Sequence, residues 1–146
     1  MFSLDDKFIF YSKLDENHRP RKIFRHEIGK AVKDDILIFE EKTKAFTVGI
    51  GLTSDEKYYL ITSSDHNTTE KYYFHVDEKI PEPKLIKERE KGIIYSINSW
   101  NNNFYMHTNK DAEDFKILVS KNINSNQWED FISAKDETLI GSLVFL

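Results

Sequence analysis

Short runs of apolar and β-branched residues, separated by polar turns, fill the chain and predict β-strands. The pattern is clearest at 46–52, 57–62 and 71–76, three runs rich in Tyr, Phe, Ile, Val and Thr. Such side chains suit the pleated surface of a sheet. The breaks hold Ser, Thr, Asp and Asn, and turns this short connect antiparallel strands. We therefore expect a meander in which 57–62 lies between the other two strands.

The meander recurs along the chain. DDKFIFY, SDEKYYLI and WNNNFYMH align with one another, so that Lys7, Lys57 and Asn103 occupy the same place in the repeat. A unit of four short strands that recurs roughly every 45 residues is typical of a propeller blade. One such sheet cannot bury both of its faces alone, so blades must stack. The sequence therefore predicts an all-β fold, a partial β-propeller of four-stranded antiparallel blades.

The repeats divide a single domain into about three blades. An incomplete blade at 1–41 lacks its opening strand, complete blades follow at 45–88 and 92–133, and 138–146 forms the first strand of a further blade. The remaining strands are expected at 7–13, 21–27, 36–41, 84–88, 93–98, 103–108, 115–120 and 128–132. No helix longer than two turns is expected, since the charged stretch at 81–92 has too narrow an apolar stripe. Because both ends cut through a unit, we interpret the chain as a piece of a longer protein.

The period of two along a strand predicts which side chains share a face. We expect Tyr58, Leu60, Phe104 and Met106 to lie on one kind of blade face. Tyrosines on two neighbouring strands are expected to pack blade against blade, as aromatic cross-strand pairs commonly do: Tyr58, Tyr59, Tyr72 and Tyr73.

The composition excludes several classes of function. A net charge of −4, spread over both signs, offers no basic stripe for nucleic acid. No apolar run approaches the roughly 18 residues of a membrane span, and the N-terminus has no secretory signal pattern. The absence of cysteine rules out disulfides, thiolate metal sites and a cysteine nucleophile. A cytoplasmic location is the default expectation.

The five histidines are the first candidates for chemistry. His26 and His75 lie at similar places in repeated strands, and His107 ends a strand, so a metal or acid–base cluster is one interpretation. Without an H-x-H or H-E-x-x-H spacing, the repeat itself explains their positions better. His18 and His66 are expected in solvated turns.

Acidic pairs and glycines are the remaining candidates. Asp5-Asp6, Asp34-Asp35 and Glu40-Glu41 are more typical of charged turns and sheet edges than of calcium or glycosidase sites. Gly49-Ile50-Gly51 lies inside a strand and is not a phosphate loop, and no glycine belongs to a G-x-S-x-G nucleophile turn. We therefore expect no catalytic, cofactor-binding or metal-binding residue in this chain.

Several runs, taken in order, resemble a known family. They are FRHEIG at 24–29, DILIFEE at 35–41, TSDEKYYL at 53–60 and TTE at 68–70. TNKDAEDFKILVS at 108–120 follows, with Asp114 where the family usually has Asn. The order and spacing of these runs resemble the propeller of the oligopeptidase B group (protease II) within the prolyl oligopeptidase family of serine peptidases.

The resemblance implies a role within a two-domain enzyme. In that family an α/β-hydrolase domain carries a Ser-Asp-His triad, and a seven-bladed propeller covers it and restricts entry to short peptides. The oligopeptidase B group cleaves after Arg or Lys. This chain is similar to the middle of the propeller only, so it is expected to be inactive alone. Alternatives are a free-standing propeller-like interaction module and an unrelated small β-sandwich or barrel enzyme.

The two ends suggest how copies could associate. Blade faces at either end are apolar, and the strand at 139–146 has no unit of its own. We expect this strand to complete the sheet that begins at 7–13, either in the same copy or in a second copy, where the exchange would give a homodimer.

Overall fold

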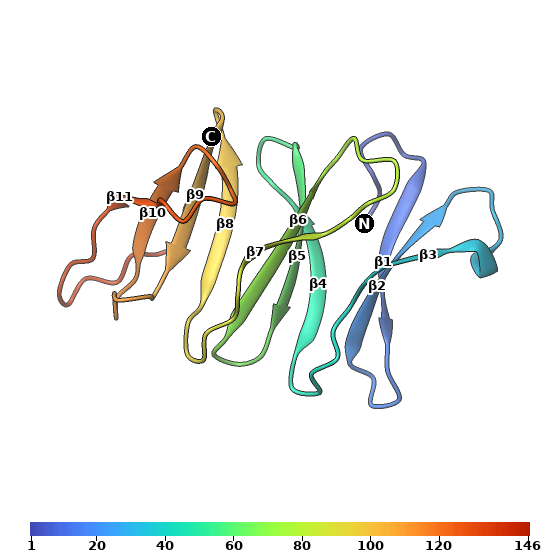
Figure 1. Cartoon of the computed structure of the whole chain (residues 1–146), viewed down its shortest axis with the longest axis horizontal. Helices are drawn as coiled ribbons and strands as arrows, with labels where there is room; N and C mark the ends of the chain where they lie inside the picture. The colour runs from blue at the N-terminus through green and yellow to red at the C-terminus, as the bar shows by residue number, and fades with distance from the viewer.

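Three antiparallel sheets of consecutive strands make up the chain, as the computed structural model of residues 1–146 shows (Figure 1). The strands are β1 (Phe8–Leu14), β2 (Pro20–Glu27), β3 (Ile36–Glu40), β4 (Thr47–Leu52), β5 (Tyr58–Ser64), β6 (Thr69–His75), β7 (Lys84–Lys87), β8 (Tyr95–Trp100), β9 (Asn103–Thr108), β10 (Lys116–Ser120) and β11 (Glu129–Ile132). Each lies within two residues of its expected bounds. The only helix is a single 3-10 turn, η1 (Val32–Asp34), so the all-β prediction is confirmed. No helix of the structure is long and apolar enough to cross a membrane.

Every sheet follows the order of its strands in the chain. The orders are β1-β2-β3, β4-β5-β6-β7 and β8-β9-β10-β11, and we call these sheets blade a, blade b and blade c. The expected central place of 57–62 and of 103–108 is therefore confirmed, because β5 and β9 each lie between two partners. The three blades stand side by side along the longest axis of the molecule, as the layers of a partial propeller do (Figure 1).

Two apolar layers hold the blades together. The layer between blades a and b comprises Phe10, Ile23, Ile38, Val48, Tyr59, Ile61 and Phe74. The layer between blades b and c comprises Leu60, Tyr73, Ile86, Tyr95, Ile97, Phe104, Met106, Leu118 and Ile123. Burying a side chain of this size contributes roughly 1.5–3 kcal/mol, so stacking is the main source of stability. Alternate residues of β5 and β6 enter different layers, which confirms that the four tyrosines pack blade against blade.

One expectation about the faces is wrong. Tyr58 and Leu60 face blade c, whereas Phe104 and Met106 face blade b, so the two pairs meet across one layer. Phe104 faces the preceding blade, so its counterpart in blade b is Tyr59, which faces blade a, and not Tyr58. The alignment of similar letters is therefore displaced by one residue from the alignment of the strands. A displacement of one moves every side chain to the other face.

The opening position of blade a holds only a short segment. Phe2 forms an isolated bridge with Ile9, Phe10 N donates to Met1 O at 2.8 Å, and the terminal amino group donates to Phe10 O at 2.9 Å. Residues 1–3 therefore lie where β4 and β8 lie in the other two blades.

The expected strand at 138–146 does not form, and this segment does not reach β1. Ile140 N donates to Asp114 O at 2.9 Å, and the ring of Phe145 packs on Trp100 and Tyr105 with centroid distances of 5.7 and 5.0 Å. The segment thus lies on the face of blade c that points away from blade b. It has no neighbouring strand with which to form a ladder, whereas this aromatic face offers apolar contact.

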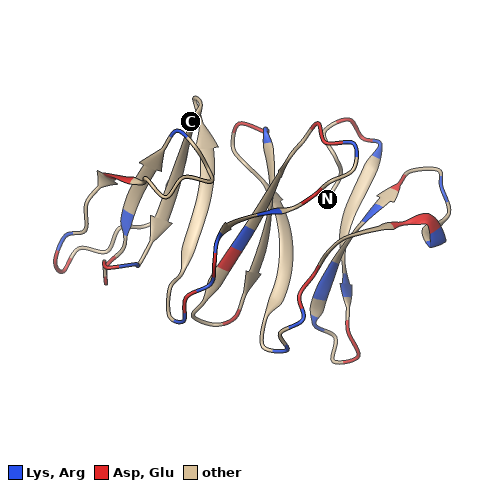
Figure 2. Cartoon of the chain, in the orientation of Figure 1, with Lys and Arg blue, Asp and Glu red and all other residues tan.

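Charged residues of both signs are spread over the loops and outer strands (Figure 2). The innermost strands β4 and β8 carry none. In the view of Figure 2, positions of the two signs are interspersed along the chain.

Candidate functional site

The histidines of the sequence lie apart from one another. His26 belongs to blade a, His75 to blade b and His107 to blade c, where its ring nitrogen lies 2.7 Å from Ile140 O. No group of three or more His, Cys, Asp or Glu side chains is placed to hold a metal ion. His18 and His66 lie in exposed turns, as expected.

His26 nevertheless belongs to a small polar cluster on the outer face of blade a. Its Nδ1 lies 2.6 Å from Asp35 Oδ1, and the Tyr11 hydroxyl donates to Asp35 Oδ2 at 2.7 Å. Both contacts lower the pKa of Asp35, and the hydrogen bond from Tyr11 has the larger effect. That hydrogen bond also raises the pKa of Tyr11 to about 12. The Asp35 side chain is 5% exposed, so its expected role as a solvated turn residue is wrong.

A larger ionic cluster joins blade a to blade b. It comprises Glu41, Ser63, Glu70, Tyr72 and Arg89, and we call it the Arg89 cluster. Glu41 follows β3 and Arg89 follows β7, while the other members lie on β5 and β6. Residues that are distant in sequence are thus brought together where the chain passes from one blade to the next.

Arg89 is the centre of this cluster. Its Nη2 donates to Glu41 Oε2 at 2.6 Å and to Glu70 Oε1 at 2.8 Å, and its amide donates to Glu70 Oε2 at 2.9 Å. The guanidinium carbon lies 4.0 Å from the centre of the Phe46 ring, within the range of a cation–π contact. The Tyr72 hydroxyl adds a hydrogen bond of 2.7 Å to Glu70.

The electrostatics of the cluster favour its charged form. Burial disfavours ionisation of Glu41, but hydrogen bonds from Ser63 and Arg89 outweigh that effect and lower the pKa of Glu41 to about 2. For Glu70 the bonds from Arg89 and Tyr72 likewise outweigh burial and lower its pKa. The hydrogen bond to Glu70 is the largest cause that raises the pKa of Arg89. Every acid and base of the cluster is engaged within it, so its role is to fix the position of blade a relative to blade b.

Sequence reasoning missed this cluster. Glu40-Glu41 was expected to solubilise an edge, but the Glu41 side chain is only 5% exposed, so the expectation is wrong for Glu41. One signal was present: Glu41 and Glu70 end the runs DILIFEE and TTE, two of the runs that carry the family resemblance. Both side chains are buried and bind Arg89.

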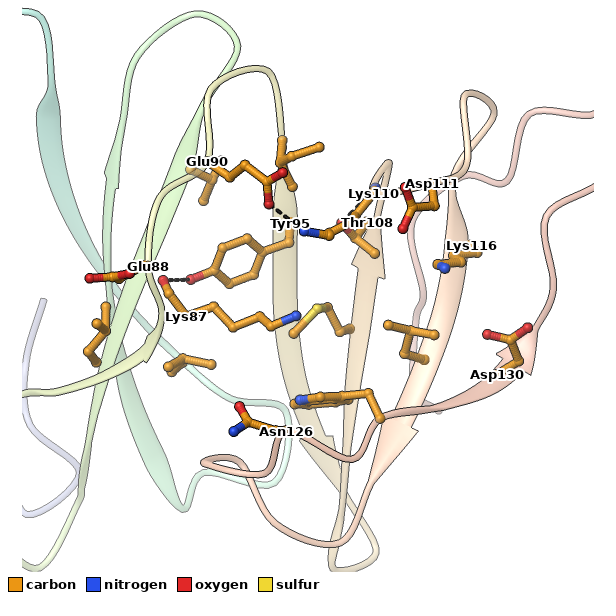
Figure 3. A pocket seen from close by; sticks show the side chains of 17 residues that line it. Lys87, Glu88, Glu90, Tyr95, Thr108, Lys110, Asp111, Lys116, Asn126 and Asp130 are labelled. Atoms are coloured by element: carbon orange, nitrogen blue, oxygen red, sulfur yellow. Dashed lines mark hydrogen bonds and ion pairs between the residues drawn. The ribbon is translucent and has the colours of Figure 1, made fainter.

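A cleft of about 530 Å³ lies between blades b and c. Figure 3 shows Lys87, Glu88 and Glu90 on the blade b side, opposite Lys116 and Asp130 of blade c. The side chains that line the cleft carry charges of both signs, and the Lys110 ammonium pairs with Glu90. The cleft thus shows no charge preference for a ligand.

Tyr95 of β8 is one of the residues that line this cleft. Its hydroxyl accepts from Lys71 N at 2.8 Å and donates to Lys87 O at 2.9 Å, across the irregularity in the pairing of β6 with β7 (Figure 3). The Tyr95 hydroxyl of blade c therefore bridges two backbone groups of blade b, at a point where β6 and β7 are not in regular register. Nearby, the buried Trp128 Nε1 has no hydrogen-bond partner.

Consecutive antiparallel sheets, stacked face to face around shared apolar layers, define part of a β-propeller. The particular family follows from comparison with known proteins. The model of the family described as prolyl oligopeptidase, N-terminal beta-propeller domain, matches residues 3–145. The chain belongs to this family.

Individual relatives agree. Protease 2 of Moraxella lacunata is 35% identical over 111 residues, which cover 76% of this chain and 16% of the relative. Oligopeptidase B from Trypanosoma brucei, solved with covalently bound antipain in a closed form, is 26% identical with a TM-score of 0.83, over 90% of this chain and 19% of that one. Oligopeptidase B from Leishmania major has the same fold, with a TM-score of 0.90 at 22% identity over 97% of this chain and 20% of that one. The chain thus spans no more than about a fifth of these relatives.

Proposed function

We propose that this chain is the propeller portion of a serine oligopeptidase that cleaves short peptides after Arg or Lys. In this proposal the propeller covers the active site of an α/β-hydrolase domain and admits substrates by size, and bond cleavage is the task of that other domain. Residues 1–41, 45–88 and 92–133 form three of its blades.

The observation that carries the proposal is the match to the propeller family over residues 3–145, together with the small share of each relative that the chain covers. The internal chemistry of the chain supports it. An ionic cluster joins blade a to blade b through the pairing of Arg89 with Glu41 and Glu70. A rigid stack of blades suits a filter, because gating by size needs a wall that keeps its shape.

A peptidase assay tests the proposal. We expect no turnover of an Arg-linked or Lys-linked chromogenic peptide by the chain alone. We expect turnover by a protein that joins the chain to an in-frame hydrolase domain with a G-x-S-x-G turn. Size filtering is measured by offering that protein a short peptide and a folded protein with the same cleavage sequence, of which only the peptide should be cut. Turnover by the chain alone would overturn the proposal.

Two further parts of the proposal concern assembly and location. We place the protein in the cytoplasm, which fractionation of the source cells would test. Exchange of residues 139–146 between two copies would complete blade a and give a homodimer. Mass measurement in solution, before and after deletion of 139–146, tests the exchange: a dimer should become a monomer, and an unchanged dimer would refute it.

A further inference from the structure

Arg25 is a buried cation without an acidic partner. It lies on β2, opposite Phe10 of β1, and is only 7% exposed. A buried guanidinium normally pairs with a carboxylate, since an unpaired buried charge is costly. Arg89, which also lies at the junction of blades a and b, has two such partners. Arg25 forms no ion pair within the chain.

The contacts of Arg25 leave most of its hydrogen-bonding capacity unused. Nη1 donates to the carbonyl oxygen of Lys79 at 2.8 Å, and this is the only hydrogen bond of the side chain within the protein. The guanidinium carbon lies 4.2 Å from the centre of the Phe8 ring, so one face of the group is stacked. A guanidinium has five N–H donors in a planar fork, and four remain for other partners. Burial lowers the pKa of Arg25, and the charge of Glu27 on the same strand offsets only part of this effect.

Arg25 lines a cleft between blades a and b of about 410 Å³. Phe10, Tyr59 and Phe74 line the same cleft and belong to the apolar layer between these blades. The volume is within the range of sites for small ligands, which are mostly apolar with a few placed polar groups. One unpaired guanidinium against an aromatic wall is such an arrangement.

The charges at the rim limit what could enter. Asp5, Asp77 and Glu78 also line the cleft, and Lys7 and Lys79 offset part of their charge. Asp5 accepts hydrogen bonds within its own turn, and Glu78 accepts one from the Glu82 amide. Asp5 also pairs with Lys7, and Asp77 lies 3.5 Å from His75. None of these acids forms an ion pair with Arg25, but together they repel a dianion. A singly charged, planar oxyanion fits best, because a carboxylate matches the fork of a guanidinium with two parallel hydrogen bonds.

We propose that the cleft between blades a and b is a carboxylate-binding site, in which Arg25 holds the carboxylate and the aromatic wall covers an apolar group beside it. The carboxylate could come from a separate peptide or from an Asp or Glu elsewhere in a longer protein. Both sources present the same chemistry to Arg25.

The test compares two probes that differ only in charge. N-acetyl-phenylalanine carries a carboxylate, and N-acetyl-phenylalaninamide has the same apolar group without it. Each is titrated into the isotope-labelled chain, and binding is followed by NMR shifts of the cleft amides and of the Arg25 side chain. Because hydrogen bonds between charged partners are worth more than neutral ones, we expect the acid to bind at least about tenfold more tightly than the amide. Equal binding of both probes, or no saturable shift with millimolar acid, would overturn the proposal.

Two variants assign the effect to Arg25. Arg25→Met keeps an apolar stem and should abolish the preference for the acid. Arg19→Met removes the same charge from an exposed turn, where the guanidinium contacts only Lys44 O, and should leave the preference unchanged. A preference that survives Arg25→Met would refute the assignment. The comparison of acid with amide on the unaltered chain remains decisive if that variant does not fold.

The same titration on the longer protein distinguishes the two sources, and this arm alone rests on the proposed function. If the acid binds the chain but not the longer protein, the carboxylate is supplied by the rest of that protein. If it binds both, the site is open to a separate ligand.

Discussion

Replacing Glu41 by Gln should destabilise the protein strongly, although it changes only one atom. Glu41 accepts hydrogen bonds from Ser63 and Arg89, and its side chain is 5% exposed. Its pKa of about 2, against an ordinary value of 4.5, corresponds to roughly 3 kcal/mol in favour of the charged form. The Arg89 side chain is 27% exposed, so water screens part of this interaction. We expect Glu41→Gln to lower the free energy of unfolding by roughly 2 kcal/mol.

Urea denaturation measures this loss, and the neighbouring acid supplies a matched control. With a slope of roughly 1.5–2 kcal/mol per molar urea, the midpoint should fall by about 1 M. Glu40 belongs to the same acidic pair, but its side chain is 39% exposed and lies 3.6 Å from Lys22. Glu40→Gln should therefore cost less than about 0.5 kcal/mol. Equal shifts for the two variants would refute the argument that the Arg89 cluster stabilises the junction.

The pH dependence follows from the same interaction. The pKa of Glu41 is lower in the folded state than in the unfolded state, so its contribution is complete above the unfolded value of about 4.5 and is lost as the pH falls towards 2. Glu70, whose pKa is also lowered, adds to this loss in the same direction. The stability of Glu41→Gln should consequently fall less steeply between pH 5 and pH 2 than that of the unaltered chain. Parallel pH profiles would contradict the assignment.

The remaining predictions concern the backbone. Tyr95→Phe removes the hydroxyl that links Lys71 N to Lys87 O, which should cost about 1–3 kcal/mol in urea denaturation, and an unchanged midpoint would exclude that role. Gly92 has φ +83° and Gly49 does not have a positive φ, and both have open space at the Cβ position. Gly92→Ala should therefore destabilise by about 1 kcal/mol and Gly49→Ala should be neutral or slightly stabilising; the reverse order of melting temperatures would refute this reading of the two backbones.

Much of the fold could be predicted from the sequence because the information is local. Runs of β-branched and aromatic residues fix the strands, and short polar turns fix antiparallel neighbours in chain order. β5 and β9 accordingly lie in the expected central positions. Because successive side chains of a strand point to opposite faces, the sequence also predicted that the rings of Tyr58 and Tyr59 pack between blades, which they do in the two different layers.

Which side chains of blade c face blade b could not be predicted in this way, because a displacement of the strand by one residue exchanges its two faces. The alignment of Lys57 with Asn103 followed similar letters, whereas the faces of the strands make Phe104 the counterpart of Tyr59. Similar residues thus occupy opposite faces in the two blades.

The buried acids could not be predicted because their partners are distant in sequence. Arg89 lies far from Glu41 along the chain, and only stacking of the blades brings them together. The fate of 139–146 was misjudged for a similar reason. Its apolar pattern suits a strand, but a strand requires a neighbour, and the aromatic face formed by Trp100 and Tyr105 provides packing in place of a ladder.

The most direct test of the central claim is covalent labelling with a fluorophosphonate, which reacts with activated serines. We predict that a protein joining this chain to an in-frame hydrolase domain is labelled, and that the label maps to the G-x-S-x-G serine of that domain. The chain alone should remain unlabelled under the same conditions. Labelling of any serine within residues 1–146, or the absence of an activated serine from the longer protein, would contradict the claim that this chain is the propeller portion of a serine oligopeptidase.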